Sequence, residues 1–427
     1  MVDQLDPPGT RERVTARPQA ARRRLPRLTE LRRLIGLKRP RFNRQARRLE
    51  SAHSIIDLRR QAMNRTPRAV FDYVDGAAEA EHSIRRSRRA WADVEFRPRV
   101  LRDVSRVDTS TTILGEPSSL PIVLGPTGFT RMMHYEGEVA VARAAQHLGI
   151  PYVLSTMGTT SPERLAAESP DVTRWFQLYV WRDRDAMRDL LERARASGHT
   201  ALVLTVDVPI QGARLRDIRN GLTIPPALTL RTLLGMARYP AWWANLLTTE
   251  PLEFATFSAF DVSPSELVDL LFDTSIDMDA LSELKEMWGG PLIVKGVQTV
   301  EDAKEVVDHG ADGVLLSNHG GRQLDRAPTP LELLPEVVAA IGDRAEVYVD
   351  GGILNGGDAL AAVALGATAC FVGRAYLYGL MAGGQDGVQR AGEILRADVE
   401  RTMILLGVTS IDQLGTEHVR LRLPGQP

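Results

Sequence analysis

Ionisable and polar side chains stand at the C-terminal ends of short apolar runs along this 427-residue chain. The run at 313–318 is the clearest case, because it leads directly into His319. A histidine near neutrality is suited to act as a general base, and an aspartate such as Asp207 can keep it aligned. Lysine and arginines at the same ends would favour an anionic substrate. The side chains at the run ends are Ser155, Gln177, Tyr179, Thr205, Asp207, Lys295, Ser317, His319, Asp350 and Arg374.

Eight such runs recur along the chain and indicate its fold. Unbroken runs of Val, Ile, Leu and aromatic residues are typical of strands buried on both faces of a parallel sheet. We therefore predict an α/β fold, a (β/α)8 TIM barrel with its active site at the C-terminal strand ends. A doubly wound sheet is the alternative, disfavoured by eight regular units without an early GxGxxG motif. The runs lie at 121–125, 151–156, 175–180, 201–207, 291–296, 313–318, 347–352 and 369–374.

Composition divides the chain into three parts. Residues 1–48 hold fifteen Lys/Arg and four Asp/Glu, so this basic leader has a net charge of +11 and the remainder −12. We expect a helical segment over 49–118, then the barrel over 119–427 with C-terminal helices and a long insertion at about 221–262. The chain contains no run of about 18 apolar residues, so we predict no membrane-spanning helix. The lone Cys370 is expected to be a packed thiol, and we predict neither a metal site nor a nucleic acid partner.

Two glycine-containing corners follow the last two predicted strands. They read DGGILNGGD at 350–358 and VGRAYLYG at 372–379. In barrels these corners commonly bind phosphate, because backbone N–H groups and a helix N-terminus face the anion. As a pair on the last two strands, they indicate a phosphorylated cofactor or substrate.

The segment LLSNHGGRQLDRAP at 315–328 resembles the signature of the FMN-dependent 2-hydroxy-acid dehydrogenases and oxidases. The resemblance runs from about Ser54 to the C-terminus and is closest to the quinone-linked L-lactate dehydrogenases of actinobacterial type. It implies FMN as cofactor and oxidation of L-lactate, or a similar L-2-hydroxy acid, to the 2-oxo acid, with electrons passed to quinone. An oxygen-dependent 2-hydroxy-acid oxidase or lactate 2-monooxygenase is the alternative. Similar segments are PTGFTR at 126–131, GARLRDIRNG at 212–221 and PLIVKG at 291–296.

The resemblance also implies roles for individual residues. His319 is the base, and Asp207 pairs with it. Arg322 and Arg214 hold the substrate carboxylate, while Tyr73 and Tyr179 contact its carboxylate and hydroxyl. Lys295 lies at the N1/O2 edge of the isoalloxazine, and no residue decides whether the α-hydrogen leaves as a proton or a hydride. The other cofactor-binding residues are Pro126, Thr127, Gly128, Ser155, Gln177, Thr205, Ser317, Asp350, Gly351, Gly352, Gly373 and Arg374.

Two residues depart from the pattern of that family. Leu354 stands where the family commonly has arginine on the phosphate loop, so FMN would rely on Arg374 and backbone N–H groups. Met157 stands where many members have tryptophan, which changes the shape of the pocket and leaves the exact acid open.

The basic leader and Trp242 and Trp243 in the insertion predict where the protein acts. Basic residues are attracted to anionic lipid, and tryptophans favour the headgroup level. We expect peripheral attachment to the cytoplasmic side of the cell membrane, and a homo-oligomer, tetramer or larger. The alternative is that the leader packs on another subunit and that the tryptophans cover the active-site mouth.

The remaining histidines are expected to take no part in chemistry. His134 is predicted to be structural, with no partner acid evident in the sequence. The others lie in helix-like or charged stretches and are predicted to be at the surface: His53, His82, His147, His199, His309 and His418.

Overall fold

The computed structural model describes residues 27, 29–30, 43–221, 237–257 and 273–422. Residues 45–427 form one compact unit, and residues 1–44 are a separate one. Most of the predicted leader therefore lies outside the described residues. Within the described ranges, none of the helices combines the length and the apolar character that crossing a bilayer would need.

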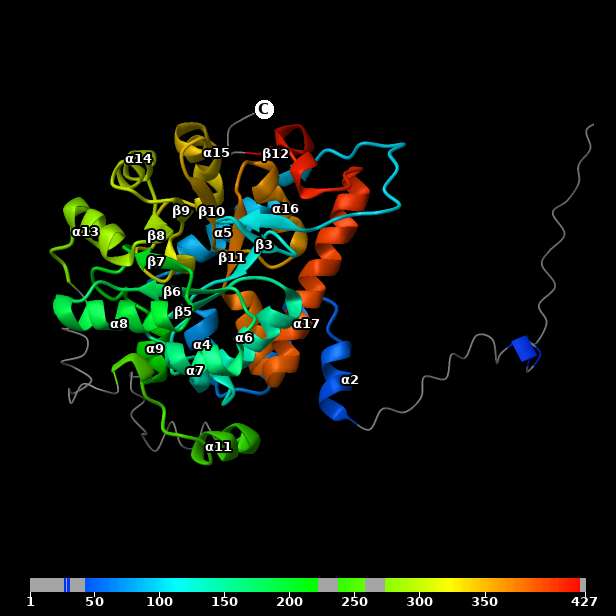
Figure 1. Cartoon of the computed structure of the whole chain (residues 1–427). Helices are drawn as coiled ribbons and strands as arrows, with labels where there is room; N and C mark the ends of the chain where they lie inside the picture. The colour runs from blue at the N-terminus through cyan, green and yellow to red at the C-terminus, as the bar shows by residue number, and fades with distance from the viewer. Residues whose placement is uncertain (1–26, 28, 31–42, 222–236, 258–272, 423–427) are drawn as a thin grey trace, which may run out of the picture. The chain divides into compact units, whose positions relative to one another are not determined.

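Eight parallel strands close into a barrel, as the apolar runs predicted (Figure 1). Around the barrel the order is β10, β11, β4, β5, β6, β7, β8, β9, and every strand begins and ends inside or within one residue of its predicted run. The parallel register pairs Ser155 with Gln177 and Thr205 with Lys295, which sets polar side chains of neighbouring strands side by side. The strands are β4 (Ile122–Leu124), β5 (Tyr152–Ser155), β6 (Arg174–Leu178), β7 (Ala201–Thr205), β8 (Leu292–Val297), β9 (Gly313–Leu316), β10 (Glu346–Val349) and β11 (Ala369–Val372).

Helices alternate with these strands and surround the barrel (Figure 1). Several begin at a side-chain cap that accepts a backbone N–H, as Asp183 and Asn355 do. The last helix is interrupted by non-helical backbone at Gly383 and Gly384. The helices are α6 (Gly137–Leu148), α7 (Pro162–Glu168), α8 (Arg184–Ala196), α13 (Met278–Trp288), α14 (Val300–Asp308), α15 (Pro330–Ile341), α16 (Gly356–Ala364) and α17 (Arg374–Leu406), with short 3-10 turns η1 (Thr130–Met132) and η3 (His319–Gly321).

The segment predicted as helical over 49–118 is helical as far as Ala92 and then forms short strands. Helix α3 packs on α17, and Arg48 at the end of α2 donates to the Ala382 carbonyl at 2.8 Å. Residues 45–48 of the predicted leader therefore belong to the same compact unit as the barrel. The elements are α2 (Arg44–Glu50), α3 (Ile55–Met63), α4 (Arg68–Asp75), α5 (His82–Ala92), β1 (Val94–Phe96), β2 (Thr111–Ile113) and β3 (Glu116–Ser118), and near the C-terminus η4 (Ile411–Gln413), η5 (Thr416–His418) and β12 (Val419–Leu421), which pairs with β1.

The connection between β7 and β8 is the longest in the barrel, and the predicted insertion lies within it. Residues 222–236 and 258–262 of that insertion lie outside the described residues. The described part contains α11 (Pro240–Leu247), which carries both tryptophans, after α9 (Leu215–Asn220) and before η2 (Ala255–Phe257).

Side chains from all eight strands fill the interior of the barrel, which is therefore a packed core and not a pore. Ile113 of the β2–β3 hairpin joins this cluster. The buried set is Ile113, Val123, Val153, Trp175, Ala201, Val203, Ile293, Leu315, Tyr348, Ala369 and Phe371. Space for chemistry is left at the C-terminal strand ends.

Three expectations about histidines are corrected by the structure. His199 and His418 are buried, at 2% and 6% exposure, and not at the surface. The Nδ1–H of His199 donates to the Ala194 carbonyl at 3.0 Å, so a local backbone bond lets this ring pack inside. His134 does have a partner acid, since its Nδ1 lies 3.7 Å from a carboxylate oxygen of Glu136. Cys370 is buried, as expected of a packed thiol.

Candidate active site

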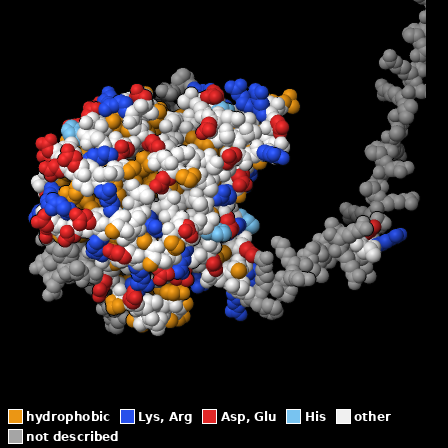
Figure 2. Space-filling model, viewed as in Figure 1, with side chains coloured by type: hydrophobic (Ala, Val, Ile, Leu, Met, Phe, Trp, Pro, Cys, Tyr) orange, Lys and Arg blue, Asp and Glu red, His pale blue; other side chains and the backbone are white. Residues whose placement is uncertain are grey.

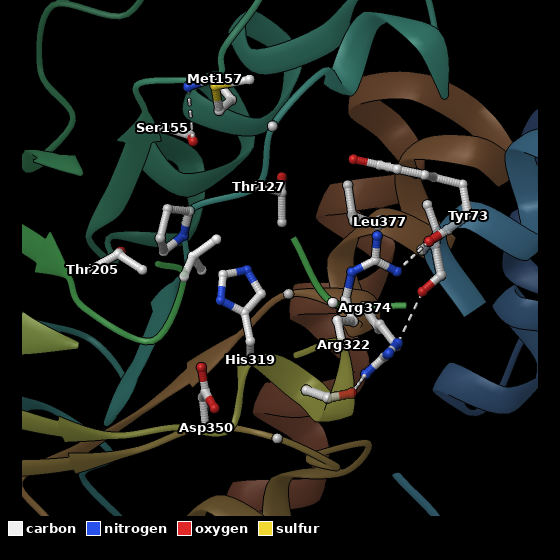
Figure 3. Close-up of a pocket in the computed structure, with 18 of the residues that line it drawn as sticks. Tyr73, Thr127, Ser155, Met157, Thr205, His319, Arg322, Asp350, Arg374 and Leu377 are labelled. Carbon is white, nitrogen blue, oxygen red and sulfur yellow. Dashed lines mark hydrogen bonds between the residues drawn. The ribbon is translucent and has the colours of Figure 1, made fainter. Parts of the chain in front are cut away.

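A cavity of about 730 Å³ lies at the C-terminal ends of the barrel strands (Figure 3). Tyr73 reaches it from α4, outside the barrel, while the other predicted site residues come from strand ends and the loops after them. All of the predicted catalytic and cofactor-binding residues line the cavity except Asp207 and Ser317. These two contact residues that do line it, so the structure brings the whole predicted set together.

His319 is held by a buried carboxylate. Its Nδ1 lies 3.0 Å from Oδ1 of Asp207, whose side chain is 1% exposed. Because a carboxylate accepts, Nδ1 carries the hydrogen and Nε2 is left as the basic atom. Burial and the nearby Lys295 charge lower the pKa of His319 to about 4, and Asp207 only partly opposes them. The imidazole is therefore neutral near pH 7 and can accept a proton.

The backbone at His319 is in the left-handed region, with φ of +56°. Such a conformation costs a non-glycine residue roughly 1–3 kcal/mol and is often found at functional sites. The following two residues also have positive φ, and both are glycine. A Cβ at Gly320 would lie 2.6 Å from Nη1 of Arg374, so the GG of the HGGR segment lets the base and the arginines approach closely.

Lys295 is a buried cation between two carboxylates. Its Nζ lies 3.9 Å from Asp207 and 4.0 Å from Asp350, and it donates to Oγ of Ser317 at 3.2 Å. The Ser317 hydroxyl in turn donates to Asp350 at 2.8 Å. Burial raises the pKa of Asp350 to about 6, although Lys295 and Ser317 act against it. The lysine can thus supply positive charge at the floor of the cavity.

A row of polar side chains crosses three neighbouring strands. The Ser155 hydroxyl donates to Oε1 of Gln177 at 2.8 Å, and Nε2 of Gln177 donates to Oγ1 of Thr205 at 3.0 Å. All three side chains are buried and fixed by these bonds. They give one side of the cavity a rigid hydrogen-bonding edge.

The C-terminal end of α4 positions two arginines (Figure 3). Arg322 donates to the carbonyls of Tyr73 and Gly76, and Arg374 donates to those of Val74 and Gly76. The last carbonyls of a helix have no partner within it and attract cations, which explains why this end collects guanidinium groups. The guanidinium of Arg322 also lies 4.8 Å from the centre of the Tyr73 ring.

These arginines make the cavity attractive to anions. Burial and the charge of Arg214 lower the pKa of Arg322 to about 9, because neighbouring cations disfavour each other. Nε of Arg214 is buried and has no hydrogen-bond partner among the residues that the structure describes. A carboxylate between Arg214 and Arg322 would relieve the repulsion and satisfy that donor.

The glycine corner after β10 is covered by helix α5. Gly351 and Gly352 both have φ of +86°. The indole Nε1 of Trp91 donates to the Gly351 carbonyl at 2.8 Å, and a Cβ at Gly352 would lie 2.9 Å from the same indole. Leu354, in the same corner, also lines the cavity.

Sequence reasoning missed several residues that line the cavity. Among the missed residues in the described ranges, two are charged, Arg88 of α5 and Asp217. Phe254 belongs to the insertion, and together with Met157 and Leu377 it forms an apolar part of the cavity lining. Arg88 could have been found from its helical spacing, which places it on one helix face with Ile84 and Trp91.

Comparisons with known proteins agree with this geometry. A profile of the FMN-dependent dehydrogenase family matches residues 62–421. The chain is 53% identical over 400 residues to a "Putative L-lactate dehydrogenase" of Mycobacterium tuberculosis, covering 94% of this chain and 97% of that protein. It is 40% identical to an L-lactate dehydrogenase of Alcaligenes faecalis, covering 85% and 97%.

A solved structure similar to this one is that of (S)-mandelate dehydrogenase, described as a monotopic membrane protein. The two agree with a TM-score of 0.83 at 37% identity, covering 87% of this chain and all of the other.

The residues around the cavity fit FMN. The volume lies within the roughly 300–1,000 Å³ usual for ligand pockets. Oδ1 of Asp350 and Nε of Arg214 are buried without a hydrogen-bond partner in the described residues, as expected where a bound molecule completes the set. A Cβ at Gly373 would meet only Thr127, at 3.7 Å, so the backbone there borders open space.

Proposed function

Because this chain belongs to the FMN-dependent dehydrogenase family, we propose that it oxidises L-lactate, or a similar L-2-hydroxy acid, to the 2-oxo acid and passes the electrons to quinone. The chain is an FMN-dependent 2-hydroxy-acid oxidoreductase with a small 2-hydroxy acid as substrate. The observation that carries the proposal is the contact between His319 and the buried Asp207, at a cavity that Arg214 and Arg322 also line.

In the proposed mechanism the two arginines orient the acid. Arg322 and Arg214 would bind its carboxylate, and a planar guanidinium can do so through two parallel bonds. Tyr73 and Tyr179 would contact the carboxylate and the hydroxyl. Burial and the charge of Asp207 raise the pKa of Tyr179 well above its usual value, so its hydroxyl keeps the hydrogen it donates.

His319 would accept the proton on Nε2, which faces away from Asp207. The imidazolium formed is stabilised by the buried Asp207 carboxylate. Burial acts to raise the pKa of Asp207, but the charges of Lys295 and His319 hold that pKa below its usual value, which favours the ionised carboxylate.

FMN, when bound, takes up the two electrons of the oxidation. Lys295 would lie beside its N1/O2 edge and offset the negative charge that develops there. Ser155, Gln177 and Thr205 would hold the ring through their hydrogen-bonding edge, with Pro126, Thr127 and Gly128 beside it. The backbone of Gly351, Gly352 and Gly373 would serve the phosphate.

The substrate assignment predicts that L-lactate bleaches the bound FMN anaerobically and without a nicotinamide. Stopped-flow absorbance with L-lactate, D-lactate, glycolate and (S)-mandelate measures it, and L-lactate is expected to give the highest second-order rate constant. A flavin spectrum indifferent to every acid in the panel, or dependence on NAD, would refute the assignment. Faster reoxidation by oxygen than by a short-chain ubiquinone would favour the oxidase alternative.

The low pKa of His319 predicts an unusual pH profile. Protonation abolishes the base, so the rate constant for FMN reduction should fall as pH drops through about 4 and stay level from pH 5 upward. An exposed histidine would give a fall near its ordinary value of about 6.5. Stopped-flow reduction by saturating L-lactate between pH 3.5 and 8 measures the midpoint, and circular dichroism confirms folding at each pH. A midpoint at 6.5 would contradict the lowered pKa of His319.

We also propose peripheral attachment to an anionic membrane through α11 and the basic leader. No residue of α11 is fully buried, and Leu247 is 74% exposed. Figure 2 shows hydrophobic side chains at the lower edge of the molecule, where Figure 1 places α11. The indole of Trp242 donates to the Met132 carbonyl at 3.0 Å, which fixes the helix to the barrel and leaves Trp243 and Leu247 as the candidate anchors.

Flotation with anionic liposomes tests this attachment. The full chain is expected to float at low salt and to be released at high salt, because each basic residue near the surface contributes about 1 kcal/mol that salt screens. Removing residues 1–42, which keeps α2, and the substitution Leu247→Glu should each weaken binding. Neutral liposomes are the control. Failure of the intact chain to float at low salt would refute the proposal.

A further inference from the structure

The sequence assigned Arg374 as the cation of the phosphate corner, but its guanidinium is already bonded to the protein. Leu354 lines the cavity and carries no charge. Each guanidinium nitrogen of Arg374 donates to a backbone carbonyl: Nε to Val74 at 2.9 Å, Nη1 to Gly320 at 2.9 Å and Nη2 to Gly76 at 2.8 Å. Arg374 is thus largely committed to holding α4 and the His319 loop, and a dianionic phosphate needs another partner.

Helix α5 brings an arginine to the same corner. Arg88 is half-buried and lines the cavity, one turn before Trp91, whose indole donates to the Gly351 carbonyl. Residues three apart share a helix face, so the Gly351 contact fixes the face on which Arg88 stands. Ser87, beside Arg88, borders the position where a Cβ of Gly352 would lie.

Arg88 differs from the other arginines of its helix. Arg86 donates to Glu332 at 2.5 Å, Arg89 lies 3.6 Å from Asp93, and Arg85 contacts the ring of His82. All three are exposed. The side chain of Arg88 makes no hydrogen bond or ion pair with any residue in the described part of the chain. A half-buried guanidinium without a partner, at the wall of a cofactor cavity, is suited to a ligand anion.

We propose that Arg88 binds the FMN phosphate, and that it supplies from helix α5 the cation absent from the loop at Leu354. Arg88 and Arg374 both line the cavity, and both cations would then lie beside the phosphate dianion. Consistent with this, the pKa of Arg374 is lowered, mainly by burial and in part by the charge of Arg88. A phosphate between the two guanidinium groups would relieve their repulsion. Neither the acid oxidised nor the electron acceptor enters this inference.

The test compares FMN with riboflavin, which has the same ring and ribityl chain but no phosphate. Apoprotein is titrated with each, and quenching of flavin fluorescence gives Kd. Arg88→Met should raise the Kd for FMN about tenfold to a hundredfold, the range for a hydrogen bond to a charged group, and leave the Kd for riboflavin within about twofold. Arg85→Met, an exposed arginine on the same helix, is the matched control and should change neither.

A second variant tests whether the two positions are equivalent. Leu354→Arg should restore much of the FMN affinity in the Arg88→Met background and gain less in the wild type, where Arg88 is already present. Should Arg88→Met fail to fold, Arg88→Lys carries the test with a smaller, FMN-specific loss. An equal change for FMN and riboflavin in these variants, or no change for FMN, overturns the proposal.

Discussion

His319→Gln is expected to slow reduction of bound FMN by L-lactate by about 10²–10⁴-fold, the usual contribution of a general base. Glutamine has a similar reach and can still donate toward Asp207, but its amide has no basic atom to accept a proton. FMN should remain bound, because none of the hydrogen bonds joining Ser155, Gln177 and Thr205 involves His319. Anaerobic stopped-flow reduction measures the effect.

The control for this substitution is His147→Gln, an exposed histidine at the end of α6. In this control variant, L-lactate should reduce the bound FMN at the wild-type rate. The Kd for FMN of the His319 variant, from fluorescence titration, separates loss of chemistry from loss of cofactor. Reduction within about threefold of wild type with FMN bound would remove His319 from the mechanism, since a general base contributes far more.

The sequence predicts the barrel well because its parallel strands are buried on both faces. Unbroken apolar runs such as 201–207 and 313–318 then mark the strands, and the polar residues after them mark the mouth. The spacing of Asp207 and His319, 112 residues apart, carries no contact information by itself. Closure of the barrel brings them to 3.0 Å, and that step needs the register of β7, β8 and β9.

Residues outside the strand–helix repeat were harder to predict. Arg88 stands on a helix before the barrel that holds four arginines, so charge alone does not indicate which one faces the cavity. The packing of Trp91 on the Gly351 corner selects it. His199 was misassigned for a related reason: its polar neighbours suggest a surface, while a bond to the Ala194 carbonyl lets the ring pack inside.

The capture of two arginines by the end of α4 could not be predicted from spacing either. Tyr73, Val74 and Gly76 contribute mainly backbone carbonyls to Arg322 and Arg374, and a carbonyl is present in every residue. Only the position of the helix end makes these acceptors available. The side chain of Asp75, bonded to Arg59 at 2.6 Å and Tyr378 at 2.8 Å, ties this helix end to α3 and α17.

Arg322→Met is the second substitution with a large expected effect. Losing a half-buried guanidinium that binds a carboxylate should lower the second-order rate constant for reduction by L-lactate about 10²–10³-fold, because the bound substrate would bury this charge pair. The effect should depend on substrate charge. L-Lactamide, which has no carboxylate, is expected to be a poor substrate for the wild type, with little further loss in the variant.

This charge dependence separates carboxylate binding from damage to the fold. Methionine leaves the Tyr73 and Gly76 carbonyls without the bonds that Arg322 provides, so a purely structural role would slow both substrates alike and also weaken FMN. Arg326→Met, an exposed arginine of the same loop, should leave both rates unchanged, and Arg322→Lys should restore part of the activity toward L-lactate alone. Equal losses for L-lactate and L-lactamide would place the carboxylate contact elsewhere, with Arg214, whose buried Nε has no described partner, as the next residue to substitute.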